Sequence, residues 1–109
     1  MENKFEAILT LVNPGFSDVV MDAAREQGAR GGTVINARGT ADKTLEKKYG
    51  VAITPDKELI LIVVNSKIKD KILDAIYKAA GLDTNGHGIA FSIPVDDVVG
   101  LKFEEKSSS

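Results

Sequence analysis

The chain has 109 residues, of which 43% are hydrophobic and 28% are charged, so we expect a single globular domain over residues 1–109. Its formal net charge of −2 argues against nucleic acid as a partner, because neutralising phosphates requires a basic face. The absence of cysteine excludes disulfides, thiolate metal sites and a cysteine nucleophile, and no metal site is expected around the single histidine. A cytoplasmic location is expected, because residues 1–5 show no secretory signal and the longest apolar run, Leu59–Val64, is too short to cross a bilayer.

The first part of the chain is predicted to form a strand, a helix and a second strand. Phe5–Val12 is rich in strand-forming residues and is followed by the turn formers Asn13–Gly15. Ser17 is the predicted N-cap of a helix that runs to about Gln27. After a pair of glycines, Thr33–Arg38 is predicted to form the second strand.

A long polar excursion follows over residues 39–57, with a helical turn predicted at Thr44–Lys48. Connections of this length are uncommon in compact domains and are usually functional or disordered. We expect the excursion to order when a ligand or a partner protein binds, with Gly39 as its hinge, and an insertion without a role stays open as the alternative. The residues expected to be buried by a partner are its apolar ones, namely Leu45, Tyr49, Val51 and Ile53.

The second part of the chain repeats the order strand, helix, strand. Glu58–Asn65 is a predicted strand, and Ser66 is the predicted cap of a helix that ends at Gly81. Ile89–Ile93 is predicted to form the fourth strand. Three short segments complete the chain: a helical turn at Asp96–Val99, a strand at Leu101–Phe103 and a flexible tail over residues 104–109.

Two β-α-β halves of similar size predict an α+β protein with the ferredoxin-like split βαβ fold, in which two helices cover one face of a four-stranded antiparallel sheet. Both alternating sets of side chains along Leu59–Val64 are apolar, which indicates that both faces of this strand are buried. Two helices cannot cover both faces of the sheet. We therefore expect a second subunit to cover the bare face, because residues 102–109 carry too little apolar surface to do so.

Four segments resemble the P-II nitrogen-regulatory family. Gly31–Val34, leading to Gly39, is similar to the second strand of that family and to the start of its extended T-loop. Phe91–Val99 is similar to the ending of the family, which has a phenylalanine, a strand and a proline-valine-acid sequence. Gly86–Gly88 stands where the family has a glycine-acid-glycine phosphate loop, and Asn13–Phe16 is similar to its first turn. The resemblance covers residues 5 to about 103.

The resemblance implies a homotrimeric, non-enzymatic signalling protein that binds a small effector in clefts between subunits. In that family the effector is an adenine nucleotide (ATP, ADP or AMP), and the T-loop acts on a partner, which is a membrane transporter or a metabolic enzyme. The resemblance places this chain in nitrogen metabolism or a related process. Carried over by position, the ligand-binding residues are Gly32, Thr33, Arg38, Gly39, Val64, Gly86, His87, Gly88, Ile89 and Lys102.

The chain departs from the family in the charged residues that hold phosphates. Ile89 stands in place of a lysine, and His87 stands in place of the acidic residue between the two glycines. Near the end, Gly100–Lys102 replaces two arginines that flank an apolar residue, so Lys102 is either the remaining cation or a surface lysine. His87 is likewise either a ligand contact or a polar residue at a turn. Weak binding of triphosphates is therefore expected.

Other proteins of similar fold remain as alternatives. A trimer of the copper-tolerance (CutA-like) type would not sense nucleotides. A small enzyme of the acylphosphatase type would need an arginine in its anion-binding loop, and Asn13–Ser17 has none. An RNA-recognition module would carry aromatic residues on its central strands, whereas Leu59–Val64 is aliphatic.

Overall fold

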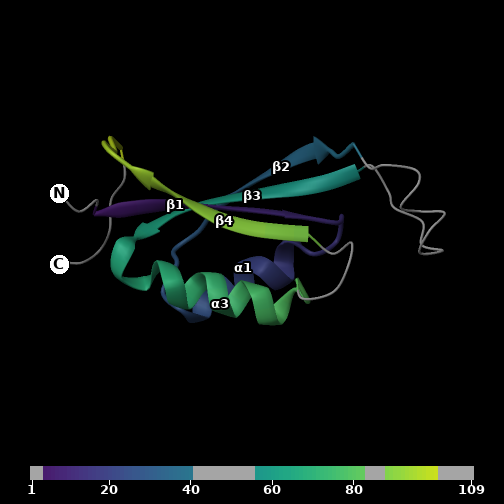
Figure 1. Ribbon diagram of the computed structural model, residues 1–109, viewed down its shortest axis with the longest axis horizontal. Coiled ribbons are helices and arrows are strands. Elements are labelled where there is room, and N and C mark those ends of the chain that lie inside the picture. The colour runs from purple at the N-terminus through teal and green to yellow at the C-terminus, as the bar shows by residue number, and fades with distance from the viewer. Residues whose placement is uncertain (1–3, 41–55, 83–87, 101–109) are drawn as a thin grey trace.

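The structure, a computed structural model, describes residues 4–40, 56–82 and 88–100 (Figure 1). Its regular elements form two successive strand-helix-strand units. In chain order they are β1 (Phe5–Val12), α1 (Ser17–Glu26), β2 (Thr33–Arg38), β3 (Asp56–Asn65), the short 3₁₀ helix η1 (Ser66–Ile68), α3 (Lys69–Ala79) and β4 (Gly88–Val95).

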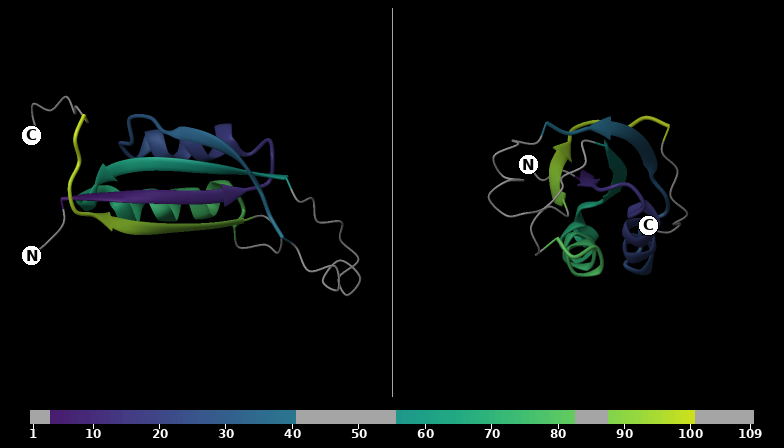
Figure 2. Two further views of the ribbon diagram at one scale, coloured as in Figure 1. Left: turned by 90° about the horizontal axis from the view of Figure 1, so that it is seen from above. Right: turned by 90° about the vertical axis from the view of Figure 1, so that its right-hand side faces the viewer.

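The four strands form one antiparallel sheet in the order β2-β3-β1-β4. Both α1 and α3 lie on the same face of this sheet, and the other face carries no helix of the described chain (Figure 2). In the middle of the sheet, Leu9 of β1 is paired with Leu61 of β3 on one side and with Phe91 of β4 on the other. This arrangement confirms the predicted α+β, ferredoxin-like fold.

The hydrophobic core lies between the sheet and the two helices. Alternate residues of the central strands point to the helices, as the two-residue period of a strand requires. The helices contribute apolar residues at helical spacing. The fully buried side chains of the core are Ile8, Val12, Val20, Ala24, Ile60, Ile62, Ile72 and Ile76.

The opposite side of the sheet, which we call the bare face, is also apolar. Leu9 and Leu61 lie on it, half-buried, between the two edge strands. On the edges, Ile35 is 43% exposed, Ile89 is 57% exposed and Phe91 is 44% exposed. The two alternating apolar sets of β3 therefore serve two different faces, and the described chain covers only one of them.

Both predicted helix caps are wrong by one residue. The helix α1 begins at Ser17, its N-cap is Phe16, and no side chain caps it. Ser66 is the first residue of η1, and the side chain of Asn65 accepts a hydrogen bond from the Lys67 N–H at 2.9 Å. Asn and Ser are comparably good caps, so residue preference alone does not distinguish between them.

The end of the described chain also differs from the prediction. β4 continues two residues beyond Ile93, because a proline at position 94 is tolerated in a strand that, within the described residues, lies at the edge of the sheet and pairs with β1 alone. Asp96–Val99 forms no helical turn, since the chain makes a bend at Asp96 and then runs irregularly to Gly100. A helical turn there would need successive residues to stay in the helical region after an extended proline-valine pair.

Candidate functional site

Several of the predicted ligand residues lie at one end of the sheet, where β1 and β2 finish and β3 and β4 begin. We call this the Gly88 end, and it is on the right in Figure 1. Arg38, the last residue of β2, is paired with Asp56, and Gly39 follows directly. Gly88 begins β4 opposite Val12. The sheet thus gathers Arg38, Gly39, Gly88 and Ile89 at the same end, although on different strands.

Gly88 is fixed by its contact with β1. Its φ is +138°, a region that side chains other than glycine rarely adopt. A Cβ atom added at this position would collide with the carbonyl oxygen of Leu11. The fold therefore requires glycine at 88 whether or not a ligand binds there, and close approach to a phosphate is an additional role that the same backbone could serve.

Two other predicted ligand residues, Gly32 and Thr33, lie at the edge of the sheet opposite to Gly88 and Ile89. Thr33 begins β2, and Gly32 precedes it so close to β3 that an added Cβ would lie 2.9 Å from the Leu61 carbonyl oxygen. β3 and β1 separate β2 from β4. Three strand spacings amount to roughly 14 Å. A single chain does not bring Gly32 and Thr33 together with Gly88 and Ile89.

Val64 occupies a different environment from the other predicted ligand residues. Its side chain is 2% exposed and belongs to the core under the helices. It is paired with Glu6, at the end of the sheet away from Gly88. In the described chain, therefore, its side chain contributes to packing.

Several predicted positions lie outside the described residues, and for them the predictions stay predictions. They include the helical turn at 44–48, the strand at 101–103 and the tail at 104–109. The site residues among them are Leu45, Tyr49, Val51, Ile53, Gly86, His87 and Lys102.

Two polar contacts at the Gly88 end were not predicted. The Lys57 ammonium donates a hydrogen bond to Asn13 Oδ1 at 2.6 Å. The neighbouring Glu58 carboxylate accepts a hydrogen bond from the Gly15 N–H at 3.3 Å. These contacts join residues 43 and 44 positions apart in the chain, so no local sequence pattern could have revealed them.

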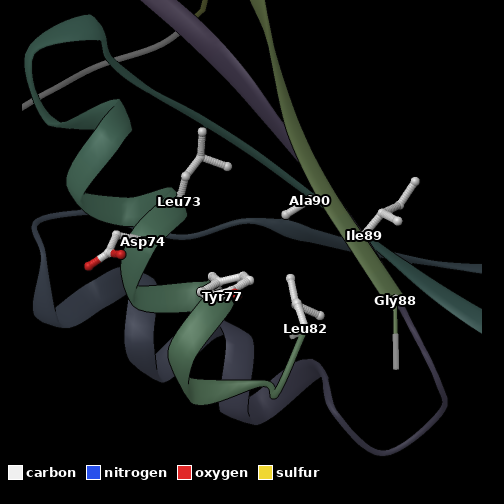
Figure 3. Close-up of a pocket in the computed structure, with 7 residues that line it drawn as sticks. All are labelled: Leu73, Asp74, Tyr77, Leu82, Gly88, Ile89 and Ala90. Carbon is white, nitrogen blue, oxygen red and sulfur yellow. The ribbon is translucent and has the colours of Figure 1, made fainter. Parts of the chain in front are cut away.

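A shallow pocket of about 420 Å³ lies beside Gly88, between α3 and β4 (Figure 3). Leu73 and Tyr77 from α3, with Leu82 and Ala90, form its mainly apolar wall, and Ile89 points away to the bare face. Asp74 is the one charged residue among those that line it, and it is paired with Lys78 at 3.0 Å. No cation lines the pocket, so its described wall is not suited to hold a chain of phosphates.

Beyond the Gly88 end, we searched the described residues for metal-binding clusters, membrane-spanning helices and shifted pKa values. Within residues 4–40, 56–82 and 88–100, no cluster of histidine, aspartate or glutamate is arranged to hold a metal ion. In the same ranges neither α1 nor α3 has the length and apolarity needed to span a membrane. At the far end of the sheet, a hydrogen bond to Asp70 at 2.9 Å raises the pKa of Lys69.

The protein is thus a small ferredoxin-like domain, and its candidate ligand residues are divided between the two edges of its sheet. Residues 5–105 match the family described as nitrogen regulatory protein P-II, and the chain belongs to this family. It is 31% identical to the nitrogen regulatory protein P-II of Azospirillum brasilense, over an alignment that covers 94% of each chain. The crystal structure of Arabidopsis thaliana PII bound to citrate is similar to it with a TM-score of 0.71 and 26% identity, over 90% of this chain and 81% of that one. The chain is therefore a PII-like regulatory protein.

Proposed function

We propose that this protein is a cytoplasmic homotrimer that binds a small effector in clefts between neighbouring copies and regulates a partner protein through residues 39–57. The partner is a membrane transporter or a metabolic enzyme, in nitrogen metabolism or a related process. The protein acts as a regulator and not as an enzyme. The observation that carries this proposal is the division of the candidate site between β2 and β4, the two edges of the sheet.

A site divided in this way is completed when β2 of one copy lies beside β4 of the next. Such a contact joins two different surfaces, and repeating it around an axis closes a ring. Gly32 and Thr33 of one copy then face Gly88 and Ile89 of its neighbour. The same assembly buries the apolar bare face, including Ile35 and Phe91, which are more than 40% exposed in the single chain.

The effector in this proposal is an adenine nucleotide that carries few phosphates, and Gly86, His87, Gly88 and Lys102 provide its remaining contacts. The Arabidopsis relative was crystallised with citrate, a small anion, which is consistent with an anionic ligand here. Among the described residues at the Gly88 end, Arg38 and Lys57 are the cations, and Lys57 already donates to Asn13. Ile89 offers no charge where the family has a lysine. We therefore expect this protein to prefer AMP or ADP over ATP more strongly than other members of the family do.

Restoring the missing cation tests this proposal. Ile89→Lys should tighten ATP binding about tenfold or more in titration calorimetry, since one charge-assisted hydrogen bond contributes about 1.5–3 kcal/mol. Val19→Lys adds the same charge on α1, in the helix layer, at a residue that is 40% exposed, and it should leave the affinity unchanged. Tight, magnesium-dependent ATP binding by the unmodified protein would contradict the proposal. A trimer that binds none of ATP, ADP and AMP would instead favour a protein that does not sense nucleotides.

A further inference from the structure

The turn between β1 and α1 is held from both sides by two consecutive residues of β3. Successive side chains of a strand point to opposite faces. Glu58 lies two residues before the buried Ile60 and therefore on the same face of β3, the helix side. From there its carboxylate accepts a hydrogen bond from the Gly15 N–H. Lys57 reaches it from the side of the bare face and donates to Asn13. We call this pair of contacts the turn bracket.

The turn bracket matters for α1 because the start of this helix has no side-chain cap. The Phe16 N–H donates to the Asn13 carbonyl at 3.3 Å, and the Val20 N–H then donates to the Phe16 carbonyl at 3.1 Å. Phe16 also packs against the core. The first turn of α1 is therefore held by the hydrogen bonds through Asn13 and Phe16, and the turn bracket helps to fix the position of Asn13.

The other side of the bracket is the first part of β3. Lys57 and Glu58 follow Asp56, which is paired with Arg38 at the end of β2. Under the proposed function, these strand ends join the segment that meets a partner protein. A displacement of residues 56–58 would break the Lys57–Asn13 hydrogen bond before it disturbed the buried residues of β3.

We propose that the turn bracket is a conformational link, through which displacement of the first residues of β3 loosens the first turn of α1. The existence of the link depends only on the contacts of Asn13, Gly15, Lys57 and Glu58. Its use in signalling rests on the proposed function. The link gives the helix layer, which lies far from the bare face, a connection to the Gly88 end.

Hydrogen exchange of the full-length protein at the Val20 and Met21 amides tests the link, with the core amides of Ile62 and Ile76 as the reference for global unfolding. Asn13→Ala and Lys57→Met should each accelerate exchange at Val20 and Met21 about fivefold, as the net loss of one hydrogen bond would, without changing the reference amides. Asn13→Asp should slow exchange there, because its carboxylate turns the hydrogen bond from the Lys57 ammonium into a hydrogen-bonded ion pair. Lys67→Met is the matched control, since Lys67 is exposed and lies beyond the far end of β3.

The combined variants decide between a specific link and a general weakening of the fold. In the Lys57→Met background, Asn13→Asp should lose its protective effect. Equal acceleration at Val20 and at Ile76, or full protection by Asn13→Asp without Lys57, would overturn the link.

The signalling role has a separate readout. Any of ATP, ADP and AMP that raises the melting temperature should change exchange at Val20 in the unmodified protein but not in Asn13→Ala. An equal change in both proteins would show that the ligand acts on α1 by another route and would overturn this role. If none of the three nucleotides binds, the proposed effector fails, while the variants alone still decide whether the link exists.

Discussion

At the scale of single residues, backbone packing decides the identity of Gly88. Its φ of +138° and the carbonyl oxygen of Leu11 leave no room for a side chain. The resemblance placed Gly88 in a phosphate loop. The structural requirement for glycine could not be predicted, because it depends on Leu11 of β1, which lies 77 positions earlier in the chain and is brought beside Gly88 by the pairing of β1 with β4. A glycine at this position therefore does not by itself indicate a ligand.

We expect Gly88→Ala to lower the free energy of unfolding by about 3 kcal/mol, because it combines backbone strain with a steric collision. Gly15→Ala is the matched control. Gly15 also has a positive φ, of +96°, but nothing lies within 4 Å of an added Cβ. It should lower the free energy of unfolding by only about 1 kcal/mol. Urea denaturation at one fixed protein concentration measures both, and equal losses would contradict the collision.

Thr10 presents the opposite case, a polar group in an apolar core. Its side chain is fully buried, and its Oγ1 has no hydrogen-bond partner among the described residues. Thr10→Val keeps the shape and removes the unpaired hydroxyl, so it should raise the free energy of unfolding by about 1 kcal/mol. Thr10→Ser, which keeps the hydroxyl and removes the methyl group, should lower it. A destabilised Thr10→Val protein would show that the hydroxyl has a partner.

At the scale of elements, hydrophobic periodicity predicted the structure well. The bounds of β1 and β2 agree with the prediction, α1 ends one residue before the predicted Gln27, and β3 begins at Asp56, two residues before the predicted Glu58. These elements have a clear alternation or helical spacing, and glycine or proline marks their ends. Periodicity could not place the caps or reveal the turn bracket, because a cap depends on the local direction of the chain and the bracket joins distant residues.

The cap of η1 provides a test at this scale. Asn65→Ala removes the acceptor for the Lys67 N–H and should lower the free energy of unfolding by about 1 kcal/mol. Ser66→Ala serves as the comparison, because the side chain of Ser66 is not the cap of η1. Thermal or urea unfolding that ranks Ser66→Ala as the more damaging of the two would restore the cap predicted from the sequence.

At the scale of the whole molecule, the described part of the chain has a hydrophobic core on one face of its sheet and leaves an apolar surface uncovered on the other. The sequence predicted this imbalance, since β3 is apolar in both alternations. The residues of the candidate site were assigned by the resemblance alone, and those assignments stay predictions. In the structure, Thr33 and Gly88 lie on opposite edges of the sheet, because the strand order is β2-β3-β1-β4. The proposal of a site between copies follows from this strand order and from the apolar bare face.

The mass of the particle in solution tests this proposal most directly. Light scattering after gel filtration, at micromolar concentration and without added ligand, should give about three times the 11.7 kDa mass of one chain. A trimer brings β2 and β4 of neighbouring copies within reach of one ligand and covers the bare face. A particle with the mass of a single chain would leave the two edges roughly 14 Å apart and would contradict a shared site.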